Sequence, residues 1–182
     1  MKVSHKKRHE VDFALGGCGK DISLGQMAAE QYADKIEKML TDVFSDSDML
    51  ILCCSGSGGT GSGSAETMIK LMSKLGRNIM VLYVLPSNSE DSLGKNNAIT
   101  TLARLANFAK NGIISSLFIV DNSRIELMNP GISMANFWET ANKQIVYPLH
   151  MFNVLSSKPS NFVSLDPMDI SKVMIGGNLP AD

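Results

Sequence analysis

The most restrictive feature of this sequence is a glycine-rich stretch, SGSGGTGSGS, between an apolar run and a segment with helical periodicity. A strand, a glycine-rich loop and a helix N-terminus together direct backbone N–H groups and the positive end of a helix dipole at one point. This arrangement favours an anion such as phosphate. A flexible turn is the alternative, but a turn does not require so many glycines at once. The five glycines of the stretch are Gly56, Gly58, Gly59, Gly61 and Gly63.

Two well-known phosphate-binding loops can be tested against this stretch. A Walker A loop requires lysine after its final glycine, whereas Ser62 follows Gly61. The dinucleotide-binding pattern G-x-G-x-x-G is satisfied from Gly56 to Gly61, which leaves an NAD-binding oxidoreductase as an alternative. That class also expects an acidic residue at the end of the next strand. Here VLYVLP contains none, and Glu90 comes several residues later.

The composition fits one globular domain and gives no strong electrostatic signal. The 182 residues include 17 basic and 18 acidic side chains, so neither direct DNA binding nor membrane binding is expected as the main interaction. The three cysteines lack the spacing of a zinc site or a disulfide framework, which favours a reducing, cytoplasmic location. No apolar run approaches the roughly 20 residues of a membrane-spanning helix.

Hydrophobic periodicity predicts alternating strands and helices. An S-x-x-Q capping box at Ser23 and Gln26 predicts a helix over residues 24–44. The other predicted elements are strands over 49–54, 79–85 and 116–120 and helices over 65–75, 96–110 and 133–155. Pro148 is expected to kink the last helix or to end its first part. This α/β succession predicts a mainly parallel sheet with helices on both faces and a ligand site beyond the carboxyl ends of the strands.

The glycine-rich stretch resembles GGGTGTG, the signature loop of the tubulin/FtsZ superfamily of GTPases, and further segments match in order over residues 15–174. The resemblance implies a Rossmann-like, three-layer GTPase domain that binds GTP or GDP and ends in a long central helix. We assign no lysine to the phosphate loops, so Mg²⁺ is expected to neutralise much of the triphosphate charge. The loop residues implied to bind nucleotide are Ser57, Gly58, Gly59, Thr60, Gly61, Ser62 and Gly63.

The resemblance also assigns residues elsewhere around the nucleotide. LGGCGKDISLGQMAAE resembles the family loop that meets the terminal phosphate, with a one-residue insertion, and Gly17, Cys18 and Gly19 would hold that place. LPSNSED would place Glu90 at the ribose. IVDNSRI would place Asn122 at the purine.

Trp138 and Asn142 repeat the family's aromatic residue and asparagine in the central helix. They are about one helical turn apart, so an indole could stack on a base while the amide binds the base edge. Core packing of Trp138 beside a solvated Asn142 is the alternative.

The resemblance implies that a neighbouring subunit completes the active site with two carboxylates. The family pattern N-x-D-x-x-D corresponds here to Ser164, Asp166 and Asp169, which makes Asp166 and Asp169 the expected water-polarising pair. No metal ligand is assigned. The alternative is an exposed helix start with Asp166 as N-cap and Pro167 at the first helical position.

The resemblance divides the chain into three segments. Residues 1–14 would be a basic segment with an edge strand, 15–155 a partial nucleotide-binding domain, and 156–182 the acidic loop and the start of the next helix. The family's first strand and first glycine loop would precede Met1, and its C-terminal domain would be missing. We therefore expect a fragment, a divergent short relative or a misassigned start.

The relaxed glycine loop and Ser164 are more similar to the plasmid and phage tubulins, TubZ and PhuZ, than to division-ring FtsZ. The resemblance implies head-to-tail filaments that hydrolyse GTP and move plasmid or phage DNA, with a DNA-bound adaptor as a further partner. A non-hydrolysing remnant or filament cap and an FtsZ-type cell-division protein stay open as alternatives.

Overall fold

The computed structural model describes residues 17–157, apart from the side chains at 134, 152, 153 and 155–157. These residues fall into two compact units, one extending to Ser123 and the other beginning at Arg124. The predicted edge strand near Val11 and the acidic loop lie outside the described residues. In chain order the elements are α1 (Ile22–Gln31), α2 (Ala33–Phe44), β1 (Met49–Ser55), α3 (Gly59–Ser73), β2 (Asn78–Leu85), α4 (Ser92–Lys110), β3 (Ser116–Asp121), α5 (Asn122–Met128) and α6 (Met134–Ser157).

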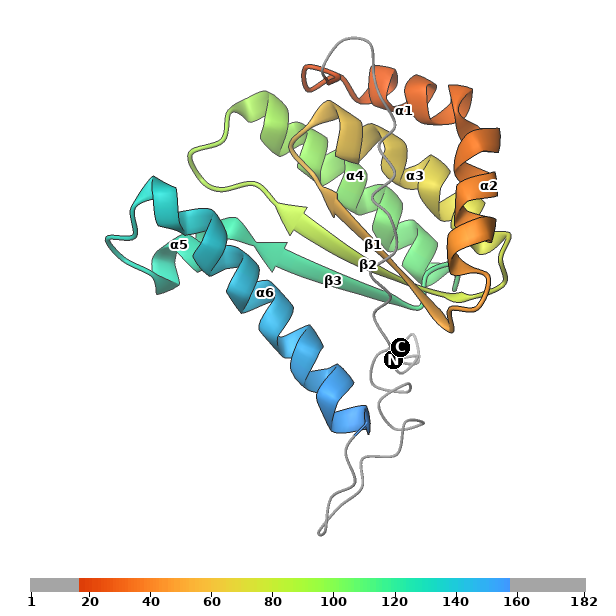
Figure 1. Ribbon diagram of the computed structural model, residues 1–182. Helices are drawn as coiled ribbons and strands as arrows, with labels where there is room; N and C mark the ends of the chain where they lie inside the picture. Colours follow the sequence, from red (N-terminus) through yellow and green to blue (C-terminus); the bar gives the residue numbers. More distant parts are fainter. Residues whose placement is uncertain (1–16, 158–182) are drawn as a thin grey trace, which may run out of the picture. The chain divides into compact units, whose positions relative to one another are not determined.

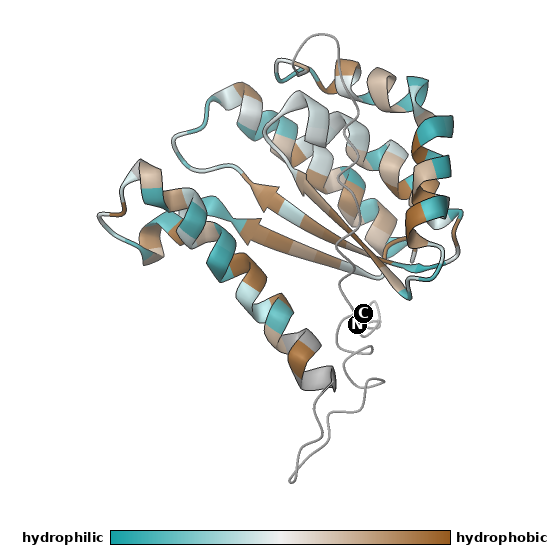
Figure 2. Ribbon diagram, in the orientation of Figure 1, coloured by the Kyte–Doolittle hydropathy of each residue, from teal (hydrophilic) through white to brown (hydrophobic). Residues whose placement is uncertain are grey.

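The first unit is built on a parallel sheet with strand order β1-β2-β3. Its register brings Leu52, Val81 and Leu117 side by side. Figure 2 shows that the strands are long apolar segments, which explains why their positions were predicted to within about one residue. All three strands point their carboxyl ends in the same direction, as successive βαβ units require. The predicted α/β fold with a parallel sheet is confirmed.

Helices α3 and α4 lie side by side across one face of the sheet (Figure 1). The core beneath them contains Ile69 of α3, Leu105 of α4 and Val81 of β2, all almost completely buried. Burying an aliphatic side chain of this size contributes about 1.5–3 kcal/mol. This packing fixes the carboxyl end of β1 against the start of α3, which positions the glycine-rich stretch.

The predicted helix over residues 24–44 is two helices. Asp21, and not Ser23, caps α1, because its carboxylate accepts hydrogen bonds from the backbone N–H groups of Ser23 at 2.8 Å and Leu24 at 3.2 Å. The chain breaks at Tyr32, so α1 crosses α3 while α2 places Ile36 and Leu40 in the core. Tertiary packing therefore overrides the continuous helical periodicity.

Three other helix predictions are corrected. Helix α4 begins four residues before the predicted start, because Asp91 caps it by accepting a hydrogen bond from Gly94 N–H at 2.8 Å. The segment NSRIELM, predicted as loop, forms α5. Pro148 lies inside α6, so the expectation that the helix ends there is wrong, and the alternative expectation of a kink stays a prediction. Gly112 adopts a φ of 69° directly after α4, which confirms it as the residue that closes this helix.

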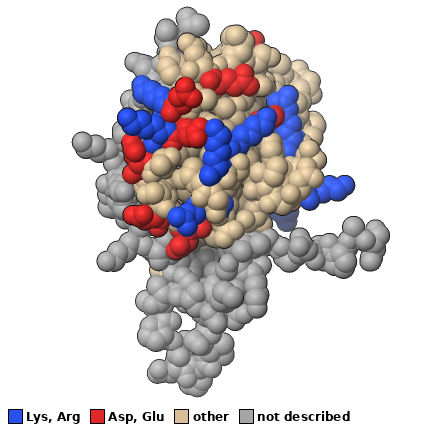
Figure 3. All heavy atoms as spheres, turned by 90° about the vertical axis from the view of Figure 1, so that its right-hand side faces the viewer, with Lys and Arg blue, Asp and Glu red and all other residues tan. Residues whose placement is uncertain are grey.

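On the face shown in Figure 3, acidic and basic side chains are interspersed and form no field of one sign. No helix within residues 17–157 is long and apolar enough to cross a membrane.

Candidate functional site

The glycine-rich stretch is half loop and half helix. Residues 56–58 connect β1 to α3, and α3 begins at Gly59 instead of the predicted residue 65. Its N-cap is Gly58, which supplies no side-chain hydrogen bond to the first turn. The first backbone N–H groups of a helix have no intrahelical acceptor. Because no side chain caps α3, its N-terminus offers these donors and the positive end of the helix dipole to an anion.

Three glycines of the stretch, Gly59, Gly61 and Gly63, are required by close contacts with backbone atoms of the chain. A Cβ added at Gly59 would lie 2.5 Å from the carbonyl oxygen of Asp21, and one added at Gly63 would overlap the carbonyl oxygen of Ile22. On the facing helix, a Cβ at Gly25 would overlap the carbonyl oxygen of Gly59. Helices α1 and α3 therefore cross with their backbones in direct contact, a requirement that sequence patterns alone did not indicate.

Gly58 is different from every other glycine in the described part of the chain. Its φ of −85° and ψ of 162° are ordinary for any residue, and no atom lies within 4 Å of the position that a Cβ would take. Neither backbone conformation nor packing among residues 17–157 explains this glycine. The other described glycines have positive φ (Gly17, Gly19, Gly76, Gly112 and Gly131) or lie against neighbouring atoms (Gly25, Gly56, Gly59, Gly61, Gly63 and Gly94).

The buried hydroxyl groups of Ser62 and Tyr83 support the loop between β1 and α3. Ser62, a predicted nucleotide-binding residue, donates a hydrogen bond to the carbonyl oxygen of Gly56 at 2.6 Å. Gly56 packs against the hydroxyl of Tyr83, which donates to the carbonyl oxygen of Ala98 at 2.8 Å. Burial raises the pKa of the Tyr83 hydroxyl, so it stays protonated as this donor. Ser62 thus holds the shape of the loop, while Thr60 lies half-buried in the first turn of α3.

A second loop, residues 17–20, lies against the start of α3. Gly17 and Gly19 have φ values of 136° and 52°, and Lys20, which is not a glycine, has a φ of 66°. Cys18 is buried, and its carbonyl oxygen accepts a hydrogen bond from the N–H of Asp21 at 2.7 Å. These conformations turn the chain sharply into α1, beside Gly59. The structure therefore brings the two predicted phosphate loops together.

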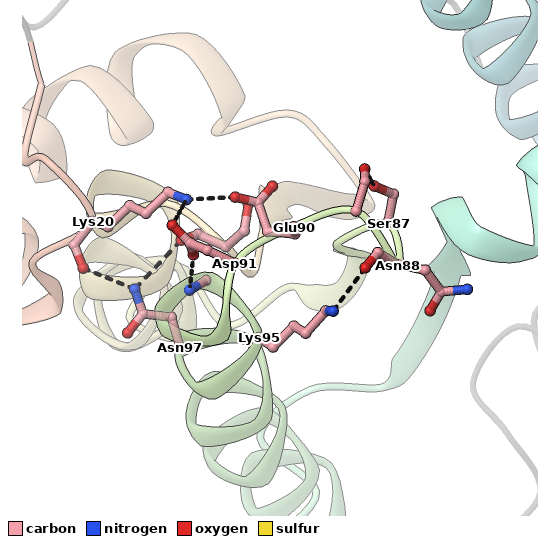
Figure 4. A network of polar contacts seen from close by, with 10 residues as sticks. Lys20, Ser87, Asn88, Glu90, Asp91, Lys95 and Asn97 are labelled. Carbon is pink, nitrogen blue, oxygen red and sulfur yellow. Dashed lines mark hydrogen bonds and ion pairs between the residues drawn. The ribbon is translucent and has the colours of Figure 1, made fainter.

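Asn97, in the second turn of α4, ties these two loops to each other. Its buried amide nitrogen donates to the carbonyl oxygen of Lys20 at 2.8 Å and to that of Ser57 at 3.4 Å (Figure 4). Sequence analysis missed this residue, because KNNA gives no indication of which asparagine is buried. The neighbouring Asn96 is exposed.

Replacing Asn97 with alanine is expected to destabilise the fold by about 1–3 kcal/mol, because two carbonyl groups lose their shared donor in a buried position. The free energy of unfolding in urea measures this loss. Asn96→Ala, the same change one position earlier on the same helix, is the matched control and should stay within about 0.5 kcal/mol of wild type. Equal effects of the two substitutions would contradict the assigned role of Asn97.

The ammonium group of Lys20 contacts two carboxylates of the loop that follows β2. It lies 2.5 Å from Oε1 of Glu90 and 2.8 Å from Oδ2 of Asp91 (Figure 4). The hydrogen bond to Asp91 is the largest cause that raises the pKa of Lys20, and the hydrogen bond to Glu90 is the second. The hydrogen bond from Lys20 is the largest cause that lowers the pKa of Asp91, and the hydrogen bond from Gly94 N–H is the second. Lys20 and Asp91 are therefore both charged at neutral pH.

The expectation that the phosphate loops contain no lysine is therefore wrong. The loop extends to the helix cap at Asp21, so it includes Lys20, directly after Gly19. Glu90, the predicted ribose ligand, lies in this same cluster. Asn122 is buried at the start of α5, directly after β3, within the same unit.

The remaining predicted residues lie elsewhere in the chain. Trp138 and Asn142 are on α6, in the unit that begins at Arg124, and both are exposed. Phe137, and not Trp138, is the buried aromatic residue, and the two rings make an edge contact with centroids 5.1 Å apart. Asp166 and Asp169 lie outside the described residues. Within residues 17–157, no group of three or more His, Cys, Asp or Glu side chains is arranged to hold a metal ion.

Comparison with known proteins gives consistent results. The family model "Tubulin/FtsZ family, GTPase domain" matches residues 10–129. The cell division protein FtsZ of Buchnera aphidicola subsp. Baizongia pistaciae is 29% identical over 159 residues, which cover 87% of this chain and 39% of the relative. FtsZ 1 of Methanocaldococcus jannaschii is 25% identical over 163 residues, which cover 90% of this chain and 42% of the relative. The chain thus spans about two fifths of the length of these curated relatives.

Solved structures show the same fold. An empty FtsZ dimer from M. jannaschii has a TM-score of 0.70 at 25% identity, covering 87% of this chain and 43% of that one. A GTPγS-form protofilament of TubZ from Bacillus thuringiensis serovar israelensis has a TM-score of 0.75 at 22% identity, covering 92% and 48%. Since the family model matches more than half of the sequence, the chain belongs to the tubulin/FtsZ family, with residues 10–129 in its GTPase domain.

Proposed function

We propose that this protein binds GTP, with the phosphates at Gly58 and the N-terminus of α3. The observation that carries this proposal is Gly58, whose missing side chain leaves open space in front of an uncapped helix start. Phosphate fits such a position because backbone N–H donors and the helix dipole both favour negative charge. Membership of a GTPase family makes guanosine the expected nucleoside.

The two tied loops would hold the phosphates from two sides. Backbone groups of Gly58 to Gly63 would bind one part of the phosphate chain, and Gly17, Cys18 and Gly19 would face its terminal group. Glu90 would accept hydrogen bonds from the ribose, and Asn122 would contact the purine. Mg²⁺ would enter with the nucleotide, held mainly by phosphate oxygens and water.

We further propose that the protein hydrolyses GTP to GDP and phosphate within head-to-tail filaments. The TubZ relative has been solved as a GTPγS-form protofilament and the FtsZ relative as a dimer, which supports self-association. A head-to-tail contact does not close on itself and therefore extends. Asp166 and Asp169 of one subunit would orient the attacking water at the nucleotide of the next, since phosphoryl transfer depends on positioning and charge.

Two cellular roles are consistent with such a filament. Movement of plasmid or phage DNA through an adaptor is our first proposal, supported by the relaxed glycine loop and by the shared fold with TubZ. Cell division is the second, because the curated relatives named above are cell-division FtsZ proteins at 25–29% identity. Imaging of the tagged protein in its own cells separates the two: a mid-cell ring supports division, and filaments that follow plasmid or phage DNA support transport.

GTP is expected to bind to the 182-residue chain at least about tenfold more tightly than ATP, a difference of about 1.4 kcal/mol. Titration with fluorescent nucleotide analogues, followed by competition with GTP and ATP, measures both affinities. At high protein concentration, GTP should also make the protein pellet.

The variant Asp166→Ala should bind GTP and pellet normally but release phosphate about a hundredfold more slowly. Absence of nucleotide binding would overturn the proposal, and normal turnover in the variant would remove Asp166 from the mechanism.

A further inference from the structure

Lys20 is a cation held at the border between the two phosphate loops and the loop after β2. Its partners are the carboxylates of Glu90 and Asp91 (Figure 4). The side chains of Lys20, Glu90 and Asp91 are 33%, 28% and 59% exposed, so water reaches all three. Ion pairs with this exposure contribute little net stability and exchange partners easily. The two ion pairs of Lys20 are therefore weak, and a stronger anion can displace the carboxylates.

The backbone of Lys20 is fixed close to the N-terminus of α3. Its carbonyl oxygen shares the Asn97 amide with the carbonyl oxygen of Ser57. The next residue, Asp21, lies against Gly59, the first residue of α3. A lysine ammonium reaches about 6 Å from its Cα on a flexible four-carbon stem. The base of this side chain is therefore held beside the start of α3, while its ammonium group contacts the two carboxylates.

A terminal phosphate is a stronger partner than either carboxylate. It carries more negative charge than a carboxylate and offers three acceptor oxygens. A diphosphate ends one phosphoryl group earlier and would not present that group to Lys20. Exchange of the carboxylates for the terminal phosphate would therefore depend on a triphosphate.

We propose that Lys20 is a triphosphate-sensing latch that exchanges Glu90 and Asp91 for the terminal phosphate of a nucleoside triphosphate. This inference rests on the proposed GTP site and adds a specificity-determining residue to it. With a triphosphate bound, Lys20 leaves Oε1 of Glu90 free to accept a ribose hydroxyl, so recognition of the phosphate end is coupled to recognition of the sugar. With a diphosphate, the latch stays on the two carboxylates.

Opposite effects of two substitutions test the latch. The measured quantity is the ratio of the GDP to the GTP dissociation constant for the full 182-residue chain. Lys20→Met keeps the stem but removes the charge, and should lower the ratio about tenfold, the expected effect of one charge-assisted hydrogen bond. Asp91→Asn removes a competing charge while keeping a good helix cap, and should raise the ratio about threefold. Lys20→Arg should keep the ratio near that of wild type.

Lys95→Met is the matched control, because Lys95 lies near the cluster but donates to the backbone oxygen of Asn88 at 2.7 Å. It should leave the ratio unchanged. A wild-type ratio in Lys20→Met, or a lowered ratio in Asp91→Asn, overturns the latch. Should Lys20→Met fail to fold in a thermal melt, the Asp91→Asn result decides. If wild type binds neither nucleotide, both the proposed GTP site and the latch are wrong. If wild type binds GTP but the variants do not change the ratio as predicted, only the latch is wrong.

Discussion

Gly63→Ala is expected to destabilise the protein by about 3 kcal/mol, although alanine is normally the better helix former by up to about 1 kcal/mol. The added Cβ would overlap the carbonyl oxygen of Ile22 and lie 2.7 Å from the backbone nitrogen of Gln26. Both atoms belong to the backbone of α1, so the clash is relieved only if the whole helix moves. Urea denaturation, with the midpoint and the slope compared to wild type, measures the change in the free energy of unfolding.

The matched control for this substitution is Gly58→Ala, five positions earlier in the same stretch. It places its Cβ in open space at an ordinary φ, so stability should stay the same or rise by less than about 1 kcal/mol. A neutral or stabilising Gly63→Ala would show that α1 and α3 are not packed backbone to backbone.

Gly58→Val is expected to weaken GTP binding by more than about a hundredfold while leaving the fold intact. Valine adopts the extended dihedrals of Gly58 readily, and no atom of the described residues lies within 4 Å of the position that its Cβ would take. The same side chain would fill the space through which a phosphate reaches the first turn of α3. Nucleotide titration gives the dissociation constant, and a thermal melt of the same sample shows whether the fold is kept.

Gly58→Ala grades this effect, because one methyl group fills less of the space and should weaken binding less than valine does. Unchanged GTP affinity in a folded Gly58→Val protein would mean that the phosphates lie elsewhere. Together with Gly63→Ala, these variants test whether Gly63 is required for stability and Gly58 for binding, although both belong to one motif.

The strands of this protein could be predicted from sequence, whereas the starts of the helices could not. A run such as MLILCC has few alternatives to a buried strand, and β1 lies where it was expected. Local capping signals were less reliable, since Ser23 and Asp21 are both acceptable caps and only the structure shows that Asp21 is used. Glycine disfavours helix, so the sequence predicted a loop as far as residue 64; contact with α1 makes the last six residues of that loop, 59–64, helical.

The candidate site was predicted only as far as family resemblance and local motifs allow. The glycine loops were found because their composition is unusual. Lys20 and Asn97 were missed, because their roles depend on distant segments that the fold brings together: Lys20 meets Glu90 seventy positions later in the sequence, and Asn97 bonds two loops at once. Neither residue type indicates such a role by itself.

The direct crossing of α1 over α3 also restricts how this domain can change over evolutionary time. Where side chains separate two helices, a larger residue on one can be compensated by a smaller one on the other. Here Gly25, Gly59 and Gly63 already have no side chain to give up. A second mutation therefore cannot compensate by making a facing residue smaller. Any substitution at these three positions must be reversed, or the angle between the helices must change.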